Sequence, residues 1–276
     1  MQKSTVLLVL LSSAGYSLQL DCQQINNQQW TITSTAEWIE TCGINSIDSN
    51  AILPLVVKQK LPTEVVALLL DSGAKVDVRD KKFGNTALYM AAWKENVEVA
   101  TLLIEKGANV NAVRWSRTGR NTTPLMTAAF RGDKDVAALL IENGADLDAQ
   151  ENPYGWTALM KAVQRDRIDV VSLLIQEGAD VNMQSQNKDT ALIFAAGYGY
   201  AEIVNMLIEN GADIDMQAAD GYTALMFAAE QGHFEAVNLL IENGADVALE
   251  SYDVHDTAYD LAKDESIKNM LEQARQ

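Results

Sequence analysis

The chain is poor in positive charge. It holds 21 Lys and Arg residues against 38 Asp and Glu residues, which gives a formal net charge of −17 over 276 residues. Nucleic acids and anionic membrane surfaces are bound mainly through cations, so the sequence argues against both as main partners. A basic protein partner is compatible with this balance, and so is an acidic surface that serves solubility alone, which is the simpler interpretation.

Residues that commonly carry catalysis or hold metals are also scarce. The only histidines are His233 and His255, and no Cys/His cluster has zinc spacing. No glycine-rich loop matches a phosphate cradle, and no Gly-x-Ser-x-Gly elbow occurs. The carboxylates recur at regular intervals, which is typical of a solvated row and does not form the oxygen cage that calcium needs. The sequence therefore predicts a protein that is not an enzyme and uses no metal and no cofactor.

Long apolar runs are missing as well, since none approaches the roughly 20 residues needed to span a bilayer. The short run at residues 6–11 follows Lys3 and precedes small residues, which is the order of a secretory signal peptide. We expect residues 1–17 to be this signal and the chain to be exported, either to a bacterial periplasm or out of the cell. A buried first helix or strand is the alternative. The only cysteines, Cys22 and Cys42, would then form a disulfide, whereas in the cytosol they would be thiols or small apolar side chains.

The rest of the sequence repeats itself. Similar stretches open at threonines spaced 37, 34, 33, 33 and 34 residues apart, namely Thr86, Thr123, Thr157, Thr190, Thr223 and Thr257. Glycines keep the same period at Gly73, Gly107, Gly144, Gly178, Gly211 and Gly244. Each threonine can cap a first helix, and each glycine suits the end of a second, apolar helix. Neither helix can bury its apolar face alone, so the units are predicted to stack into a solenoid.

These units resemble ankyrin repeats. The resemblance rests on stretches such as TPLMTAA, VAALLIENG and GADLDAQ, and it covers about residues 50–275. It implies an all-α solenoid of helix–turn–helix units with β-turn or hairpin-like loops. The histidine usual in the family's opening motif is replaced at five positions, namely Tyr89, Met126, Met160, Ile193 and Met226.

The expected domain organisation follows from this pattern. Residues 50–276 form the repeat domain, with a degenerate first repeat that lacks the threonine and the alanine pair, five well-formed helix pairs and a short C-terminal cap. Residues 18–49, which include both cysteines, are expected to cover the exposed apolar end of the stack. No obvious room is left for a separate catalytic domain.

The resemblance also implies how the chain works. Ankyrin proteins bind other proteins through the concave surface made by the first helices and the loop tips. We therefore expect a monomeric, non-enzymatic interaction module. An inhibitor or immunity protein, or a secreted effector that acts on one enzyme or toxin, is the alternative.

Equivalent positions of the first helices stack into rows on that surface, because residues three and four apart share a face. One row is Met90, Thr127, Lys161, Phe194 and Phe227. The two other rows begin at Trp93 and Lys94, and in the N-terminal half they are aromatic and basic.

One loop stands out beside these rows. The segment VRWSRTGR, residues 113–120, holds three arginines, one tryptophan and no acid, and its loop takes 16 residues from Gly107 to Thr123 where the others take 12 or 13. It is predicted to be an extended fingertip, although Trp115 could instead pack against its own repeat and the arginines could merely balance carboxylates. The residues predicted to bind a partner with acidic patches are Trp93, Lys94, Arg114, Trp115, Arg117, Arg120, Phe130, Arg131, Arg165 and Tyr198.

Overall fold

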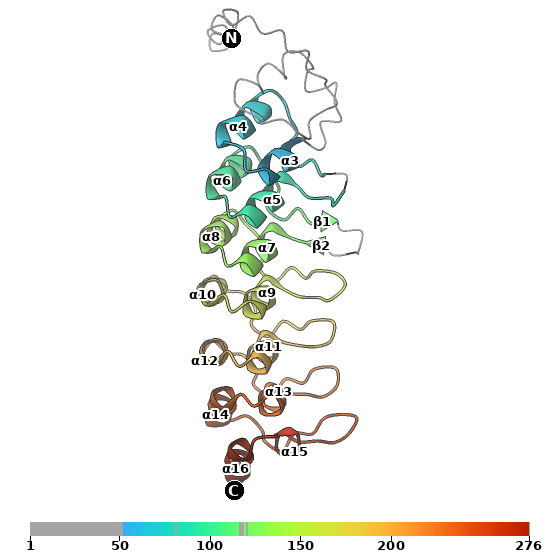
Figure 1. Cartoon of the computed structure of the whole chain (residues 1–276), viewed down its shortest axis with the longest axis vertical. Coiled ribbons are helices and arrows are strands. Elements are labelled where there is room, and N and C mark those ends of the chain that lie inside the picture. Colours follow the sequence, from blue (N-terminus) through green and yellow to red (C-terminus); the bar gives the residue numbers. More distant parts are fainter. Residues whose placement is uncertain (1–51, 81, 116–118, 120, 276) are drawn as a thin grey trace, which may run out of the picture.

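The fold is seen in a computed structural model that describes residues 52–275 except residues 81, 116–118 and 120 (Figure 1). The expected signal peptide, the capping segment at residues 18–49 and the Cys22–Cys42 disulfide lie outside the described residues, as do Arg117 and Arg120. These expectations therefore stay predictions.

Helix pairs stack one upon another in two columns, with the first helix of each pair in one column and the second helix in the other (Figure 1). The pairs are α3 (Ile52–Lys58) with α4 (Thr63–Asp71), α5 (Ala87–Lys94) with α6 (Val97–Glu105), α7 (Pro124–Arg131) with α8 (Lys134–Glu142), α9 (Ala158–Gln164) with α10 (Ile168–Gln176), α11 (Ala191–Tyr198) with α12 (Ala201–Glu209), α13 (Ala224–Gln231) with α14 (Phe234–Glu242), and α15 (Ala258–Leu261) with α16 (Glu265–Ala274). The expected all-α solenoid is confirmed. Within the described part of the chain, no helix has the length and apolar character to cross a bilayer.

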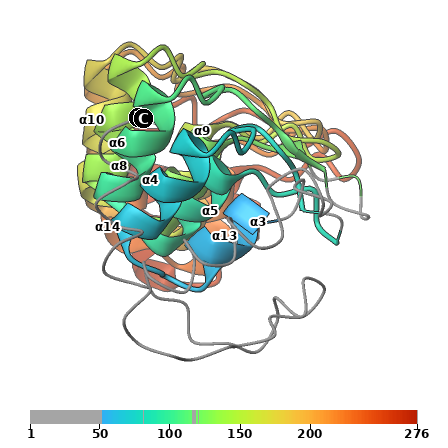
Figure 2. The same cartoon turned by 90° about the horizontal axis from the view of Figure 1, so that it is seen from above.

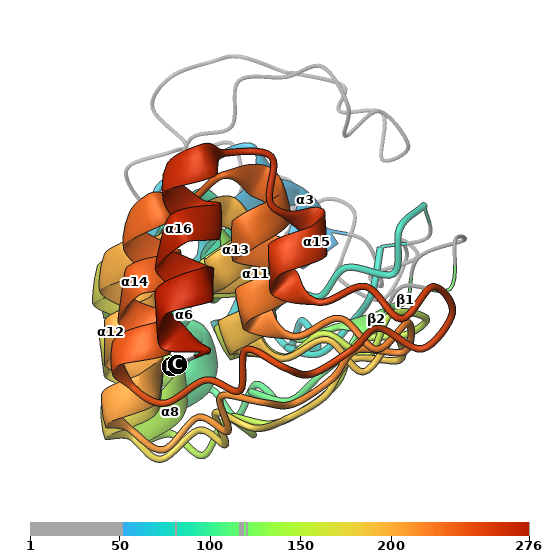
Figure 3. The same ribbon diagram turned by 90° about the horizontal axis from the view of Figure 1, so that it is seen from below.

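The loops between successive pairs project together to one side of the stack, as the two views along its axis show (Figures 2 and 3). We call each loop, from the glycine after a second helix to the next capping threonine, a finger. The long finger closes as a small antiparallel hairpin, in which β1 (Arg114–Trp115) pairs with β2 (Asn121–Thr122). The extended fingertip expected from the loop length is therefore a hairpin.

Local chemistry explains why α5, α7, α9, α11 and α13 each begin directly after a threonine. The hydroxyl oxygen of the threonine accepts a hydrogen bond from the backbone N–H three residues later, for example from Tyr89 to Thr86 and from Met126 to Thr123. This bond satisfies one of the amides that a helix start leaves without a partner. Because this signal is local, the period of the threonines alone was enough to place these helices.

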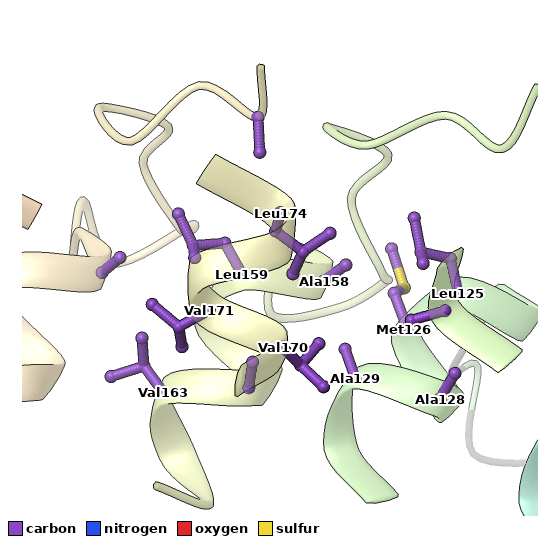
Figure 4. Close-up of a cluster of buried hydrophobic side chains, with 14 of the residues drawn as sticks. Leu125, Met126, Ala128, Ala129, Ala158, Leu159, Val163, Val170, Val171 and Leu174 are labelled. Carbon is purple, nitrogen blue, oxygen red and sulfur yellow. The ribbon is translucent and has the colours of Figure 1, made fainter. Parts of the chain in front are cut away.

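The core lies between consecutive pairs and depends on small side chains. Ala128 and Ala129 of α7 are fully buried, and they belong to the same apolar layer as Leu125, Leu159 and Val170 (Figure 4). A methyl group at these positions allows the next helix to approach closely, while the leucines fill the space between units. The alanine pairs thus set the distance at which one unit's inner surface meets the next.

Asp133, the residue that caps the start of α8, should make the stability of the fold depend on pH. One oxygen of Asp133 accepts from the Val136 N–H at 3.2 Å, whereas the other is buried without a hydrogen-bond partner. Burial raises the pKa of the Asp133 carboxyl. The folded-state pKa thus lies above the unfolded-state value, so the charged form costs stability at neutral pH, and this cost disappears as the pH falls through the folded-state pKa.

Asp133→Asn is expected to relieve this cost, because Asn96 already caps α6 by accepting from the Val99 N–H at 2.9 Å. At neutral pH the variant should melt about 1–2 °C higher than the wild type, the shift that roughly 0.5 kcal/mol gives in a domain of this size. The difference should shrink when both are melted below the ordinary Asp pKa of about 3.9, where the carboxyl is protonated in the folded and the unfolded state alike. A variant that melts lower than the wild type at neutral pH would contradict this account.

Candidate functional site

The first helices and the fingers together form one face of the solenoid, which we call the inner face. Its floor is the row that begins at Met90, and the structure buries this row more deeply than its place on a helix surface suggested. Met90, Thr127 and Lys161 are only 5%, 2% and 8% exposed. The side chains that a partner could touch are those of the two other rows, in which Trp93, Arg131, Arg165 and Tyr198 are exposed while Lys94 and Phe130 are half-buried.

In the N-terminal half of the inner face, arginines lie over aromatic rings of the preceding unit. The Arg131 guanidinium lies 5.3 Å from the centre of the Trp93 ring, and the Arg165 guanidinium lies 4.3 Å from the centre of the Phe130 ring. Arg131 is also held by Glu95, whose Oε1 accepts from its Nε at 2.8 Å. Cation–π contacts of this kind contribute about 0.5–1 kcal/mol at exposed sites. They fix the rings in place while Trp93 stays 39% exposed.

The hairpin directs its two strand residues to opposite sides. Trp115 is 64% exposed, and the Arg79 guanidinium of the preceding finger lies 5.1 Å from the centre of its ring. Its side chain is therefore not packed into its own repeat, the alternative that the sequence left open. Arg114 instead turns away from the fingertip and is half-buried. The expectation that Arg114 belongs to the exposed tip is corrected here, because consecutive residues of a strand point to opposite faces.

Arg114 reaches the floor of the inner face. Its Nη1 donates to the Tyr89 hydroxyl oxygen at 3.0 Å, and its guanidinium lies 5.4 Å from the centre of the Tyr89 ring and 5.9 Å from that of Phe83. Two surface hollows, of about 320 and 220 Å³, share Tyr89, Trp93 and Arg114 in their walls. Arg114 therefore lies at the junction of two partly apolar depressions.

Another charged pair joins the floor to a finger. The Lys161 ammonium on α9 pairs with the Glu151 carboxylate, and both side chains are almost completely buried. The Thr122 hydroxyl lies 3.5 Å from the second Glu151 oxygen, and the ammonium lies 4.5 Å from the centre of the Trp156 ring. The sequence rows included Lys161 but missed Glu151. The available signal was that Glu151 stands where other units have Ser185, Ala218 or Ser251, in the repeat that also carries this lysine.

Towards the C-terminus the inner face continues as aromatic rings without arginines. The rings of Trp156 and Phe194 meet edge-on at 5.2 Å between centres, and those of Phe194 and Tyr198 lie nearly parallel at 6.4 Å. Tyr198, predicted from the sequence to bind a partner, is 43% exposed at the end of this series. The structure thus brings Tyr198 onto the same face as Trp93 and Arg131, in a neutral part of it.

The charge of the chain is divided unevenly along the solenoid. Residues 58–167 hold 16 Lys and Arg against 14 Asp and Glu, a net charge of +2, whereas residues 168–276 hold 4 against 20, a net charge of −16. The arginines of the inner face therefore stand in the part of the molecule where acidic residues repel a negative partner least. In the described residues, no group of three or more His, Cys, Asp or Glu side chains is placed to hold a metal ion.

Comparison with known proteins agrees with this geometry. The family model described as "Ankyrin repeats (3 copies)" matches residues 32–114, 112–185 and 175–251. The structure is similar to the ankyrin repeat domain of Bcl-3, a member of the IkappaB protein family, with a TM-score of 0.69 and 26% identity over 80% of this chain and 97% of that one. It is also similar to the ankyrin repeat domain of human ASB11, with a TM-score of 0.70 and 25% identity over 81% of this chain and 97% of that one.

A curated relative is matched only in part. The E3 ubiquitin-protein ligase KEG of Arabidopsis thaliana is 28% identical over 109 residues, which is 35% of this chain and 6% of the ligase. The chain thus spans a small fraction of that protein.

Proposed function

The chain belongs to the ankyrin repeat family, whose repeats are protein–protein interaction modules, and from this premise we propose that it binds another protein through the N-terminal half of its inner face. The observation that carries the proposal is the pairing of arginines with aromatic rings across successive units, Arg131 with Trp93 and Arg165 with Phe130. Aromatic residues and arginine are the types that most often anchor protein interfaces.

These arginines and aromatic side chains contribute little to the stability of the fold. A solenoid is held together by the buried alanines and leucines between its units, and a tryptophan that is 39% exposed adds little to that core. Held by a cation, such a ring loses little further freedom when a partner covers it, which lowers the entropic cost of binding. The inner face is therefore suited to recognition by a preorganised surface.

The charge division suggests the kind of partner. A protein with an acidic patch would be attracted to the arginine-bearing half and repelled by the C-terminal half, so charge would fix its orientation on the solenoid. We propose such a partner, bound by a single copy of this chain.

Affinity capture tests the proposal. The full chain serves as bait for extracts of each cell compartment and of the secreted fraction, beside a variant that carries Trp93→Ala and Phe130→Ala. Phe234→Ala is the matched control, because Phe234 is an aromatic side chain of similar exposure, 44%, on the second-helix column. One protein retained by the wild type and by the control but lost by the double variant is the expected result. Retention by all three baits would place recognition elsewhere.

A further inference from the structure

We infer that Arg114 is the centre of a carboxylate-binding site, which accepts an aspartate or glutamate side chain from an extended segment of the partner while neighbouring apolar side chains of that segment enter the two hollows. The inference rests on the proposed function and adds the chemistry that the partner must present.

Two other cations of the inner face are neutralised by neighbouring carboxylates. Arg131 has Glu95 beside it, and Lys161 has Glu151. Arg114 is half-buried, yet among the described residues no carboxylate pairs with it. A guanidinium that is partly removed from water in this way is stabilised by an anion.

The hydrogen bonds of Arg114 indicate where that anion would sit. Nη1 already donates to the Tyr89 hydroxyl oxygen, and Nε is buried without an acceptor, which leaves Nη2, to which no described residue offers an acceptor, as the nitrogen that a partner can reach. A terminal N–H of a guanidinium donates a strong, charge-assisted hydrogen bond to a carboxylate. The edge of the guanidinium that is not engaged by Tyr89 is thus the one that a carboxylate uses.

The hollows on either side fit the side chains of a peptide. Their volumes, about 320 and 220 Å³, lie at or below the lower limit of small-molecule pockets, which begin at about 300 Å³. The first is bordered by Phe83 and Met90 and the second by Met126 and Phe130, so both offer apolar contacts. An acidic side chain flanked by apolar ones matches this order of apolar hollow, cation and apolar hollow.

A carboxylate also fits better than a phosphate group. Phosphorylated segments are usually held by several arginines, because the group carries about two negative charges and three acceptor oxygens. Among the described residues, Arg114 is the only cation shared by both hollows. Lys58 borders the first hollow alone, and Lys161 pairs with Glu151, whose carboxylate borders the second hollow and would repel a group with two negative charges. The site is therefore matched to a single negative charge.

Selection from a library of random linear peptides tests the inference without knowledge of the partner. The full chain is used to select binders, and the same selection is repeated with Arg114→Gln, with Arg114→Lys and with Arg167→Gln, which removes an exposed arginine at the start of the second helix α10. Circular dichroism and melting confirm that each variant is folded. Arg114→Lys keeps the charge but not the planar fork of donors, so it tests geometry apart from net charge.

We expect the wild type and Arg167→Gln to enrich peptides with Asp or Glu next to large apolar residues, at least tenfold over the unselected library. Replacing that acid with its amide should weaken binding of a selected peptide about tenfold, which corresponds to roughly 1.4 kcal/mol. With Arg114→Gln this preference should vanish, and with Arg114→Lys it should be reduced. Unchanged acidic enrichment with Arg114→Gln would overturn the inference.

The proposed function fails in a different way. If the selected peptides bind the Trp93→Ala, Phe130→Ala double variant as well as the wild type, the inner face is not the binding surface. If they lose affinity for that variant but show no acidic preference, the inner face binds partners and only the role of Arg114 is wrong. A selection that enriches nothing contradicts both.

Discussion

Glu151→Gln is expected to lower the free energy of unfolding by about 3 kcal/mol, because it leaves the buried Lys161 ammonium facing a neutral amide. The wild-type carboxylate is only 2% exposed and pairs directly with that ammonium. Burying a charge is costly unless an opposite charge and hydrogen bonds compensate it, so removing one partner costs more than the pair itself contributes. Urea unfolding of the wild type and the variant at neutral pH measures the difference.

The neighbouring unit supplies the control for this prediction. There Ser185 stands in the place of Glu151, and Phe194 stands in the place of Lys161. The double replacement Glu151→Ser with Lys161→Phe copies that combination and removes both charges. It should recover most of the stability that the single variant loses, because it removes both charges and leaves no buried charge without a partner. If the single variant loses less than 1 kcal/mol, or if the double variant loses more than the single one, the pair is not the link between floor and finger that we describe.

Trp93→Ala is expected to weaken partner binding about 30-fold, the loss of roughly 2 kcal/mol that marks an interface hot spot. The reason is that this ring is half-exposed, held by Arg131 and shared between the walls of both hollows. Arg131→Ala should cost less, because it removes the cation but leaves the ring. Isothermal titration of the captured partner against both single variants and the double variant measures these effects.

The double-mutant cycle gives this prediction its specificity. If Arg131 acts by holding Trp93, the loss in the double variant should be smaller than the sum of the two single losses by about 0.5–1 kcal/mol. Phe234→Ala should leave the affinity unchanged. Strictly additive losses would mean that the two side chains contact the partner independently, and a loss of affinity in Phe234→Ala would contradict the assignment of the inner face.

The sequence predicted the solenoid well because its signals are local. A capping threonine and a terminal glycine act within one turn of the helix that they bound, so their period fixes each unit regardless of its neighbours. The same logic placed Trp93, Phe130 and Arg131 on one face, since positions three and four apart on a helix lie together.

The side-chain contacts of the inner face could not be predicted from the sequence. Arg131 lies 38 positions after Trp93, so the repeat period places the two in neighbouring rows of successive units but does not show that their side chains touch. The inward turn of Arg114 follows from the hairpin register, which the composition of the finger does not specify. The burial of Lys161 required knowing that Glu151, on the finger that leads into the same helix, lies within reach of it. These features depend on the three-dimensional arrangement of fingers and helices, which the local signals do not fix.

The measurement that tests the central claim most directly is oxidative footprinting of the full chain with and without the captured partner. Trp93 and Phe234 differ little in exposure, at 39% and 44%, so each reports on its own surface under the same conditions. We predict that the partner protects Trp93 and Phe130 strongly and leaves Phe234 and the exposed Tyr252 unchanged. Protection of Phe234 or Tyr252, with Trp93 oxidised as fast as in the isolated chain, would contradict binding at the N-terminal half of the inner face.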